Sequence, residues 1–272
     1  MAPTTLEPTM QSLGTLFGFK PAPSDIHPCS TAPSFYPSDI QPPLPQPSPL
    51  MKNLSGVSLF LIMVGLTLGS SHSLRADAAP SVSLARLKAG NARFVSGRLT
   101  HPNLSRERRA ELTGGQRPVA VIVACADSRV PPELVFDEGL GDLFVVRVAG
   151  NVLNDQIVGS IEYAVVNLGT RLIIVLGHEG CGAVTSARST LSAGGRAAGH
   201  IQSILEAIRP AVEATRGQDL AATSLANVRH VVDALQHSPP ILQAQVAAGS
   251  VQVVGANYLL ESGVVAFDEA AH

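Results

Sequence analysis

The sequence contains no tryptophan, few other aromatic residues and only three cysteines among 272 residues. It also lacks an excess of either charge, since 19 basic residues are balanced by 21 acidic ones. A protein that binds a polyanion needs a surplus of lysine and arginine, so we expect no nucleic acid partner. Hydrophobic residues make up 45% of the chain, which excludes a wholly disordered protein.

Proline is scarce in most of the chain, because twelve of the 20 prolines lie in residues 1–49. A proline has no amide hydrogen to donate and clashes with the preceding turn of a helix, so this segment is unsuited to helices and central strands. We therefore predict that residues 1–50 form a disordered proline-rich extension. We also expect Met51 to be the true start of the protein, with this extension upstream of it.

The segment that follows has the pattern of a secretion signal. Met51 and Lys52 begin it, an apolar run spans residues 54–68, and the Ala-Asp-Ala sequence at 76–78 has the form of a signal-peptidase site. The apolar run is shorter than the ~20 residues that a bilayer span requires. These features predict a signal peptide over residues 51–78 and export, to the periplasm. An uncleaved membrane anchor is the alternative, and only then would the membrane be a partner.

The remaining residues, 79–272, are numerous enough for a single domain with its own core. Apolar runs alternate there with segments of helical periodicity, which is typical of a parallel sheet covered by helices. The sequence therefore predicts an α/β fold with a central, mostly parallel β-sheet flanked by helices and an added edge strand. Predicted strands are 119–124, 143–148, 171–176, 250–254 and the edge strand 264–267. Predicted helices begin at residue 81 and span 103–112, 154–168, 181–191, 201–214, 220–237 and 241–248.

Two of these strands end in segments that carry reactive side chains. The first strand is followed by Cys125, Asp127 and Arg129, and the third by His178 and Cys181. Because the carboxyl ends of parallel strands meet at one edge of a sheet, we expect both segments to open on the same side. Two thiolates and an imidazole suit Zn²⁺, and three protein ligands with an open fourth position are typical of catalytic zinc.

Each part of this pattern also has a simpler interpretation. Two cysteines in an exported protein can form a disulfide, and His178 taken alone can be an ordinary turn residue. Asp127 and Arg129 can be a local ion pair of small energetic value. The glycine-flanked His178–Cys181 pair, with a second cysteine at another strand end, favours the metal site. The remaining histidines lack partners at ligand spacing and are predicted to lie at the surface: His101, His200, His230, His237 and His272.

The two motifs together resemble the signature of the β-class carbonic anhydrases. They are Cys-x-Asp-Ser-Arg at 125–129 and His-x-x-Cys-Gly at 178–182. The segments 143–151, 255–258 and 263–265 are also similar to segments of that family. The resemblance extends over residues 92–267, and the combination of motifs is specific where any one piece alone would be weak.

This resemblance implies one zinc ion per chain, held by Cys125, His178 and Cys181. Asp127 and Arg129 would form a hydrogen-bonded catalytic pair beside the metal, and in some family members that aspartate becomes a fourth metal ligand at low pH. The implied reaction is the reversible hydration of carbon dioxide to bicarbonate and a proton by zinc-bound hydroxide. The resemblance further implies a homodimer or a dimer of dimers.

Two other functions stay open on the same residues. Hydrolases of carbon disulfide or carbonyl sulfide resemble this family and share the zinc ligands, so access to the pocket would decide the substrate. A non-catalytic module, stabilised by structural zinc or by a Cys125–Cys181 disulfide, is the other alternative. The presence of Asp127 and Arg129 argues against it, because a purely structural cross-link does not need them.

Overall fold

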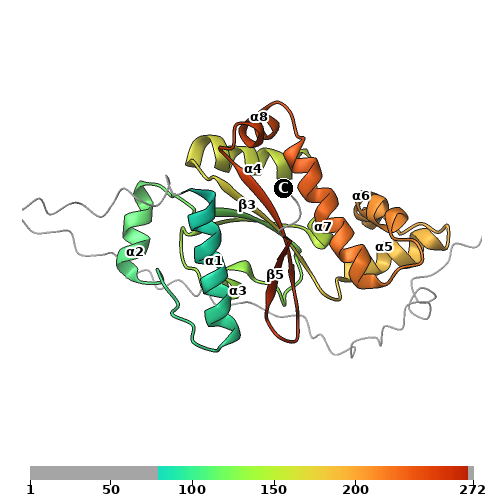
Figure 1. Ribbon diagram of the computed structural model, residues 1–272, viewed down its shortest axis with the longest axis horizontal. Coiled ribbons are helices and arrows are strands. Elements are labelled where there is room, and N and C mark those ends of the chain that lie inside the picture. Colours follow the sequence, from blue (N-terminus) through green and yellow to red (C-terminus); the bar gives the residue numbers. More distant parts are fainter. Residues whose placement is uncertain (1–78, 269–272) are drawn as a thin grey trace, which may run out of the picture. The chain divides into compact units, whose positions relative to one another are not determined.

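The computed structural model describes residues 79–268 (Figure 1). The predictions for the extension 1–50 and the signal segment 51–78 lie outside the described residues and are untested. Among the residues that are described, no helix has the length and apolar character needed to cross a membrane.

A five-stranded sheet in the order β2-β1-β3-β4-β5 forms the centre of this part of the chain. Strands β1 to β4 run parallel to one another, and β5 runs antiparallel to β4 at one edge. Every residue of β1 and β3 is buried, as their continuous apolar runs predict. The predicted α/β fold with an added edge strand is therefore confirmed. The strands are β1 (Ala120–Ala124), β2 (Leu143–Arg147), β3 (Leu172–His178), β4 (Gln252–Tyr258) and β5 (Val265–Asp268).

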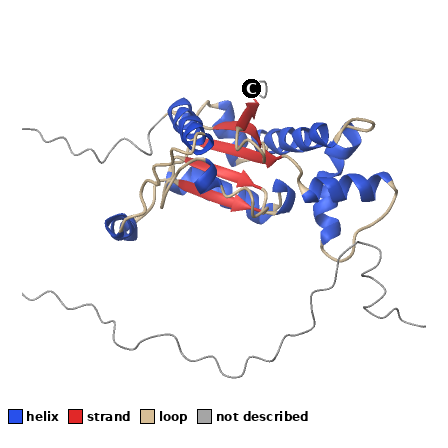
Figure 2. Ribbon diagram, turned by 90° about the horizontal axis from the view of Figure 1, so that it is seen from below, coloured by secondary structure: helices blue, strands red, loops and turns tan. Residues whose placement is uncertain are grey.

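Helices cover both faces of the sheet (Figure 2). One face packs against residues that include Leu87 and Phe136, and the other against Ile161, Val228 and Leu242. A third apolar cluster contains Cys125 and Cys181 beside the helices that follow β3. The helices are α1 (Pro80–Val95), α2 (Arg106–Glu111), α3 (Pro132–Val135), α4 (Asp155–Leu168), α5 (Gly182–Ser192), α6 (Ile201–Ala214), α7 (Leu220–Gln236) and α8 (Ile241–Ala247), with 3₁₀ turns η2 (Leu112–Gly114) and η3 (Ala149–Asn151).

The main differences from the predicted elements concern α2, β4, α3 and η3. Helix α2 begins later than predicted, because Asn103 has a φ of 57° and Ser105 caps the helix by accepting from the Arg108 amide. Strand β4 begins two residues later than the predicted range 250–254 and continues to Tyr258, and its last four residues pair with β5. Helix α3 and turn η3 were not predicted, since each is too short to show a helical period.

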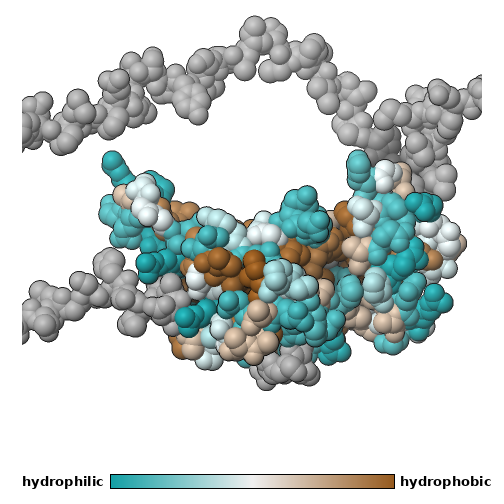
Figure 3. Space-filling view, turned by 90° about the horizontal axis from the view of Figure 1, so that it is seen from above, coloured by the Kyte–Doolittle hydropathy of each residue, from teal (hydrophilic) through white to brown (hydrophobic). Residues whose placement is uncertain are grey.

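Part of the surface is apolar. Strand β2 forms the second edge of the sheet, and Tyr163 and Val166 on α4 are 52% and 59% exposed. Figure 3 shows apolar residues gathered in the middle of one face and flanked by hydrophilic ones. An apolar surface of this kind is typical of protein interfaces. The expected homodimer or dimer of dimers remains a prediction.

The buried carboxylate of Asp137 ties α1 and the loop after it to the segment that follows α3. Asp137 accepts hydrogen bonds from Arg93 Nε, from the amide and hydroxyl of Thr100, and from the His101 amide. Burial raises the pKa of this carboxyl, but the hydrogen bonds from Arg93, Thr100 and His101 outweigh that effect and hold the pKa well below its usual range. The backbone of Asp137 is left-handed, with a φ of 49°, a conformation that aspartate and asparagine tolerate.

We expect Asp137→Asn to lower the free energy of unfolding by roughly 1.5–3 kcal/mol at neutral pH, the value of hydrogen bonds to a charged group. Because the folded-state pKa of Asp137 is depressed, its contribution is complete above the unfolded-state pKa of about 3.9 and is lost as the pH falls below it. Urea unfolding of both proteins at pH 7 and below about pH 4 measures this. The exposed carboxyl of Glu133 provides the control, Glu133→Gln. An equal loss at both pH values would contradict the charge-based explanation.

Candidate metal centre

Cys125, His178 and Cys181 lie together at the carboxyl edge of the sheet. Cys125 directly follows β1, His178 is the last residue of the neighbouring strand β3, and Cys181 is the N-cap residue of α5. Their sulfur and imidazole nitrogen atoms all lie within 4.8 Å of one another. The structure thus brings together the three ligands predicted from two separate motifs.

The two sulfur atoms are close but not bonded. Both cysteines are free, and their Sγ atoms are 3.9 Å apart, against about 2.05 Å in a disulfide. The alternative of a Cys125–Cys181 disulfide is therefore wrong for this structure. The Cys181 thiol lowers the pKa of Cys125, and the same contact raises the pKa of Cys181. A cation bound between the two sulfur atoms would stabilise both as thiolates.

The imidazole of His178 has one nitrogen free for a ligand. Its Nδ1 lies 2.9 Å from the carbonyl oxygen of Glu179, which can only accept, so Nδ1 carries the hydrogen. The other nitrogen, Nε2, is buried and has no hydrogen-bond partner within the described part of the chain. Burial lowers the pKa of His178, but the Cys125 sulfur, the Glu179 carbonyl and the Asp127 carboxylate together outweigh burial and raise it. A buried polar atom without a partner is uncommon, and a metal ion would satisfy the Nε2 lone pair.

The donor set fits zinc. Two sulfur ligands and one nitrogen match the borderline softness of Zn²⁺, and all three residues are at most 4% exposed. The backbone N–H of Gly150 donates to Cys125 Sγ at 3.2 Å, a bond that favours the thiolate form. The residues present are therefore those that a zinc ion would require.

Asp127 and Arg129 form the pair predicted beside the cluster. Arg129 donates from Nε to Asp127 Oδ1 at 2.9 Å and from Nη2 to Oδ2 at 2.7 Å. Those hydrogen bonds hold the pKa of the Asp127 carboxyl well below its usual range, so it is ionised at neutral pH. Asp127 Oδ2 also lies 3.8 Å from His178 Nε2, which places an ionised carboxylate next to the unpartnered nitrogen.

Arg147, the last residue of β2, was missed by the sequence reasoning. It donates from Nε to the Cys125 carbonyl at 2.9 Å and from Nη2 to the Asp127 carbonyl at 2.5 Å. It thereby fixes the backbone that carries one predicted ligand and the predicted acid–base group. Its position at a strand end next to β1 is the signal that could have identified it.

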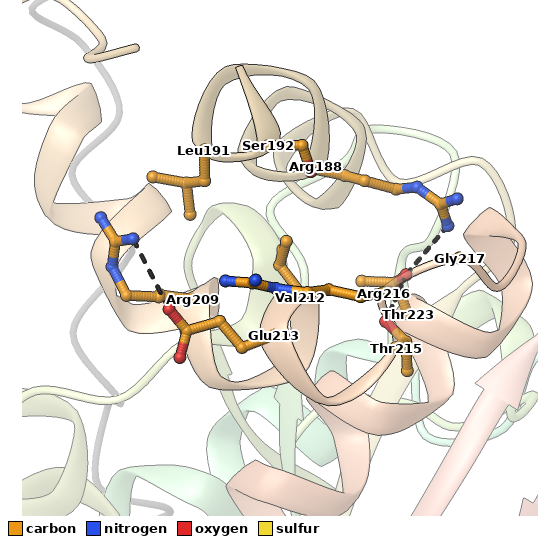
Figure 4. A pocket seen from close by; sticks show the side chains of 10 residues that line it. All are labelled: Arg188, Leu191, Ser192, Arg209, Val212, Glu213, Thr215, Arg216, Gly217 and Thr223. Atoms are coloured by element: carbon orange, nitrogen blue, oxygen red, sulfur yellow. Dashed lines mark hydrogen bonds and ion pairs between the residues drawn. The ribbon is translucent and has the colours of Figure 1, made fainter. Parts of the chain in front are cut away.

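A pocket of about 320 Å³ lies elsewhere, between α5 and the α6–α7 turn, and contains none of the predicted site residues (Figure 4). Two of its arginines have partners within the chain. Arg188 donates to Thr223 Oγ1 and to the carbonyl of Gln218, and Arg209 pairs with two glutamates of its own helix. The Arg188 contacts connect α5 to α7 and to the turn before it, whereas the Arg209 pairs stay within α6.

Known proteins share this fold and sequence pattern. Residues 120–265 match the family model described as carbonic anhydrase. Carbonic anhydrase 2 of Mycobacterium tuberculosis is 43% identical over 187 residues, covering 68% of this chain and 90% of that protein. A carbonic anhydrase of Mycolicibacterium smegmatis is 44% identical over 189 residues, covering 68% and 92%. The solved β-carbonic anhydrase CafA of Aspergillus fumigatus has a TM-score of 0.54 and 27% identity, covering 71% of this chain and 91% of that one.

Proposed function

The chain belongs to the β-class carbonic anhydrases, which are lyases, and we propose that it hydrates carbon dioxide reversibly with one zinc ion held by Cys125, His178 and Cys181. The observation that carries this proposal is the convergence of three buried ligand atoms within 4.8 Å, one of them an unpartnered nitrogen. Zinc bound there would supply a Lewis acid that makes water a nucleophile at neutral pH.

The chain's own residues would orient the reactants. Ionised Asp127 can accept a hydrogen bond from the attacking water, because its carboxylate lies 3.8 Å from His178 Nε2 and its side chain is 18% exposed. Arg129 keeps that carboxylate ionised and holds both its oxygens. If Arg129 released it, Asp127 would be the candidate fourth metal ligand, since Oδ2 is already 3.8 Å from His178 Nε2.

A comparison of three substrates on one purified sample tests this function. We expect about one zinc per chain, and faster hydration of carbon dioxide than hydrolysis of carbonyl sulfide or carbon disulfide. Hydrolysis of either sulfur compound without carbon dioxide hydration would favour the alternative hydrolase on the same ligands. Zinc without any of these activities would favour the non-catalytic module.

We also propose that the protein is exported, with cleavage after Ala78, on the strength of the basic, apolar and small-residue segments in 51–78. N-terminal sequencing of the protein from its native cell envelope is expected to begin at Ala79. A terminus at Met51 in the membrane fraction would instead favour the anchor. An intact Met1 on cytoplasmic protein would contradict both the start site and the signal.

A further inference from the structure

A second hydrogen bond lies behind the one that reaches Cys125. The side chain of Asn227, in the middle of α7, donates from Nδ2 to the carbonyl oxygen of Gly150 at 2.9 Å. Gly150 in turn donates its own N–H to Cys125 Sγ. Two successive contacts therefore connect α7 to one of the proposed zinc ligands, and the first of them joins residues 77 positions apart in the sequence.

One backbone hydrogen bond, from the Asn151 amide to the Val148 carbonyl oxygen at 3.0 Å, closes the turn between these contacts. Gly150 and Asn151 have φ values of 73° and 44°, so two consecutive residues are left-handed. A side chain at Gly150 has no room, because a Cβ atom would come within 2.8 Å of Ile208 Cδ1 and 3.1 Å of Ala183 Cβ. The turn must therefore be held through its backbone.

Asn227 is suited to hold it. The residue is 1% exposed, and its neighbour Val228 is fully buried against the sheet, so the helix presents the amide from a packed and rigid element. The Nδ2–carbonyl bond restrains the peptide between Gly150 and Asn151, whose N–H makes the hydrogen bond that closes the turn. The Gly150 N–H belongs to the preceding peptide, and the two peptides meet at the Gly150 Cα. A change in the φ or ψ of Gly150 after loss of the Asn227 bond would therefore turn that N–H away from Cys125 Sγ.

We propose that Asn227 is a positioning residue of the metal centre, which acts through Gly150 to keep an N–H directed at Cys125 Sγ. The inference rests on the proposed zinc site. An N–H donor to a thiolate stabilises its charge and orients its lone pairs, so its loss alters both the affinity for the metal and the sulfur–metal bond. Loss of such an outer-shell partner typically costs about 10–100-fold in metal affinity or activity.

Two substitutions separate this role from simple packing. Asn227→Leu keeps a comparable volume without the donor, and Asn227→Asp keeps the shape but places an oxygen against the Gly150 carbonyl. The matched control is Ser224→Ala, one turn earlier on α7. Ser224 is 5% exposed and its hydroxyl has no hydrogen-bond partner in the described part of the chain. The control therefore removes a buried polar atom and leaves both hydrogen bonds, from Asn227 to Gly150 and from Gly150 to Cys125, in place.

The test measures zinc affinity by chelator competition, and the sulfur-to-metal charge-transfer band of the cobalt-loaded protein. We expect both Asn227 variants to bind zinc about 10–100-fold more weakly and to shift that band, while Ser224→Ala changes neither. The rise in Tm on adding zinc should also shrink in the Asn227 variants, whereas a purely structural role would lower the Tm of the apo and zinc-loaded forms alike.

Unchanged affinity and an unchanged band in the Asn227 variants, with zinc bound normally by the wild type, would overturn this inference alone. If Asn227→Leu fails to fold, Asn227→Asp decides the question by the same measurements. A wild-type protein that binds no zinc would overturn the proposed function, and this inference with it.

Discussion

Cys181→Ser is expected to leave the protein with little zinc and to reduce carbon dioxide hydration by more than the roughly 10–100-fold that loss of an outer-shell partner costs. The substitution replaces a soft thiolate with a hydroxyl that is a poor zinc ligand, and it leaves two protein ligands where three converge. His178→Ala is expected to have the same result, because it removes the single nitrogen ligand.

Metal content, hydration rate and circular dichroism should be measured together, because Cys181 is 2% exposed and a buried hydroxyl could also destabilise the fold. Ser186→Ala, on the exposed side of α5, provides a control that should keep both zinc and activity. Full zinc content in both Cys181→Ser and His178→Ala would rule out this metal site.

The sequence predicts this site because its chemistry lies at strand ends. Continuous apolar runs identify β1 and β3, and parallel strands that are neighbours must place their final residues side by side. Cys125 and His178 could therefore be placed together without coordinates. The Asp127–Arg129 pair could also be predicted, because only one residue separates its members in the sequence.

The supporting contacts could not be predicted in the same way. Arg147 and Asn227 act through backbone carbonyls, which any residue type supplies, so no motif marks these contacts. Only the position of Arg147 at a strand end could have drawn attention to it. The left-handed turn at Gly150 and Asn151 is too short to have a period. These contacts depend on how β2 and α7 pack against β1 and β3, which only the three-dimensional structure defines.

Asp127→Asn is expected to keep its zinc and to lose about 10²–10⁴-fold in carbon dioxide hydration, the typical value of a general acid–base group. The amide is uncharged and cannot offer two acceptor oxygens to Arg129 and water. Zinc should remain, because the three proposed ligands are unchanged. A zinc-loaded Asp127→Asn protein with the wild-type rate would show that Asp127 only caps the turn, where its Oδ1 accepts from the Arg129 amide at 3.0 Å.

Arg129→Ala tests the other half of the pair through its pH dependence. The hydrogen bonds from Arg129 are the main cause of the lowered pKa of Asp127, so their loss raises that pKa toward its ordinary value of about 3.9 or above. The ionised fraction of Asp127 then falls on the acid side, and a released carboxylate can also turn toward the metal from 3.8 Å away. Both effects make the loss of hydration deepen as the pH falls. Hydration rates across pH, with zinc content checked, should show this for Arg129→Ala but not for Arg109→Ala, an exposed arginine on α2. A loss that is constant across pH would mean that Arg129 does not act through the ionisation or release of Asp127.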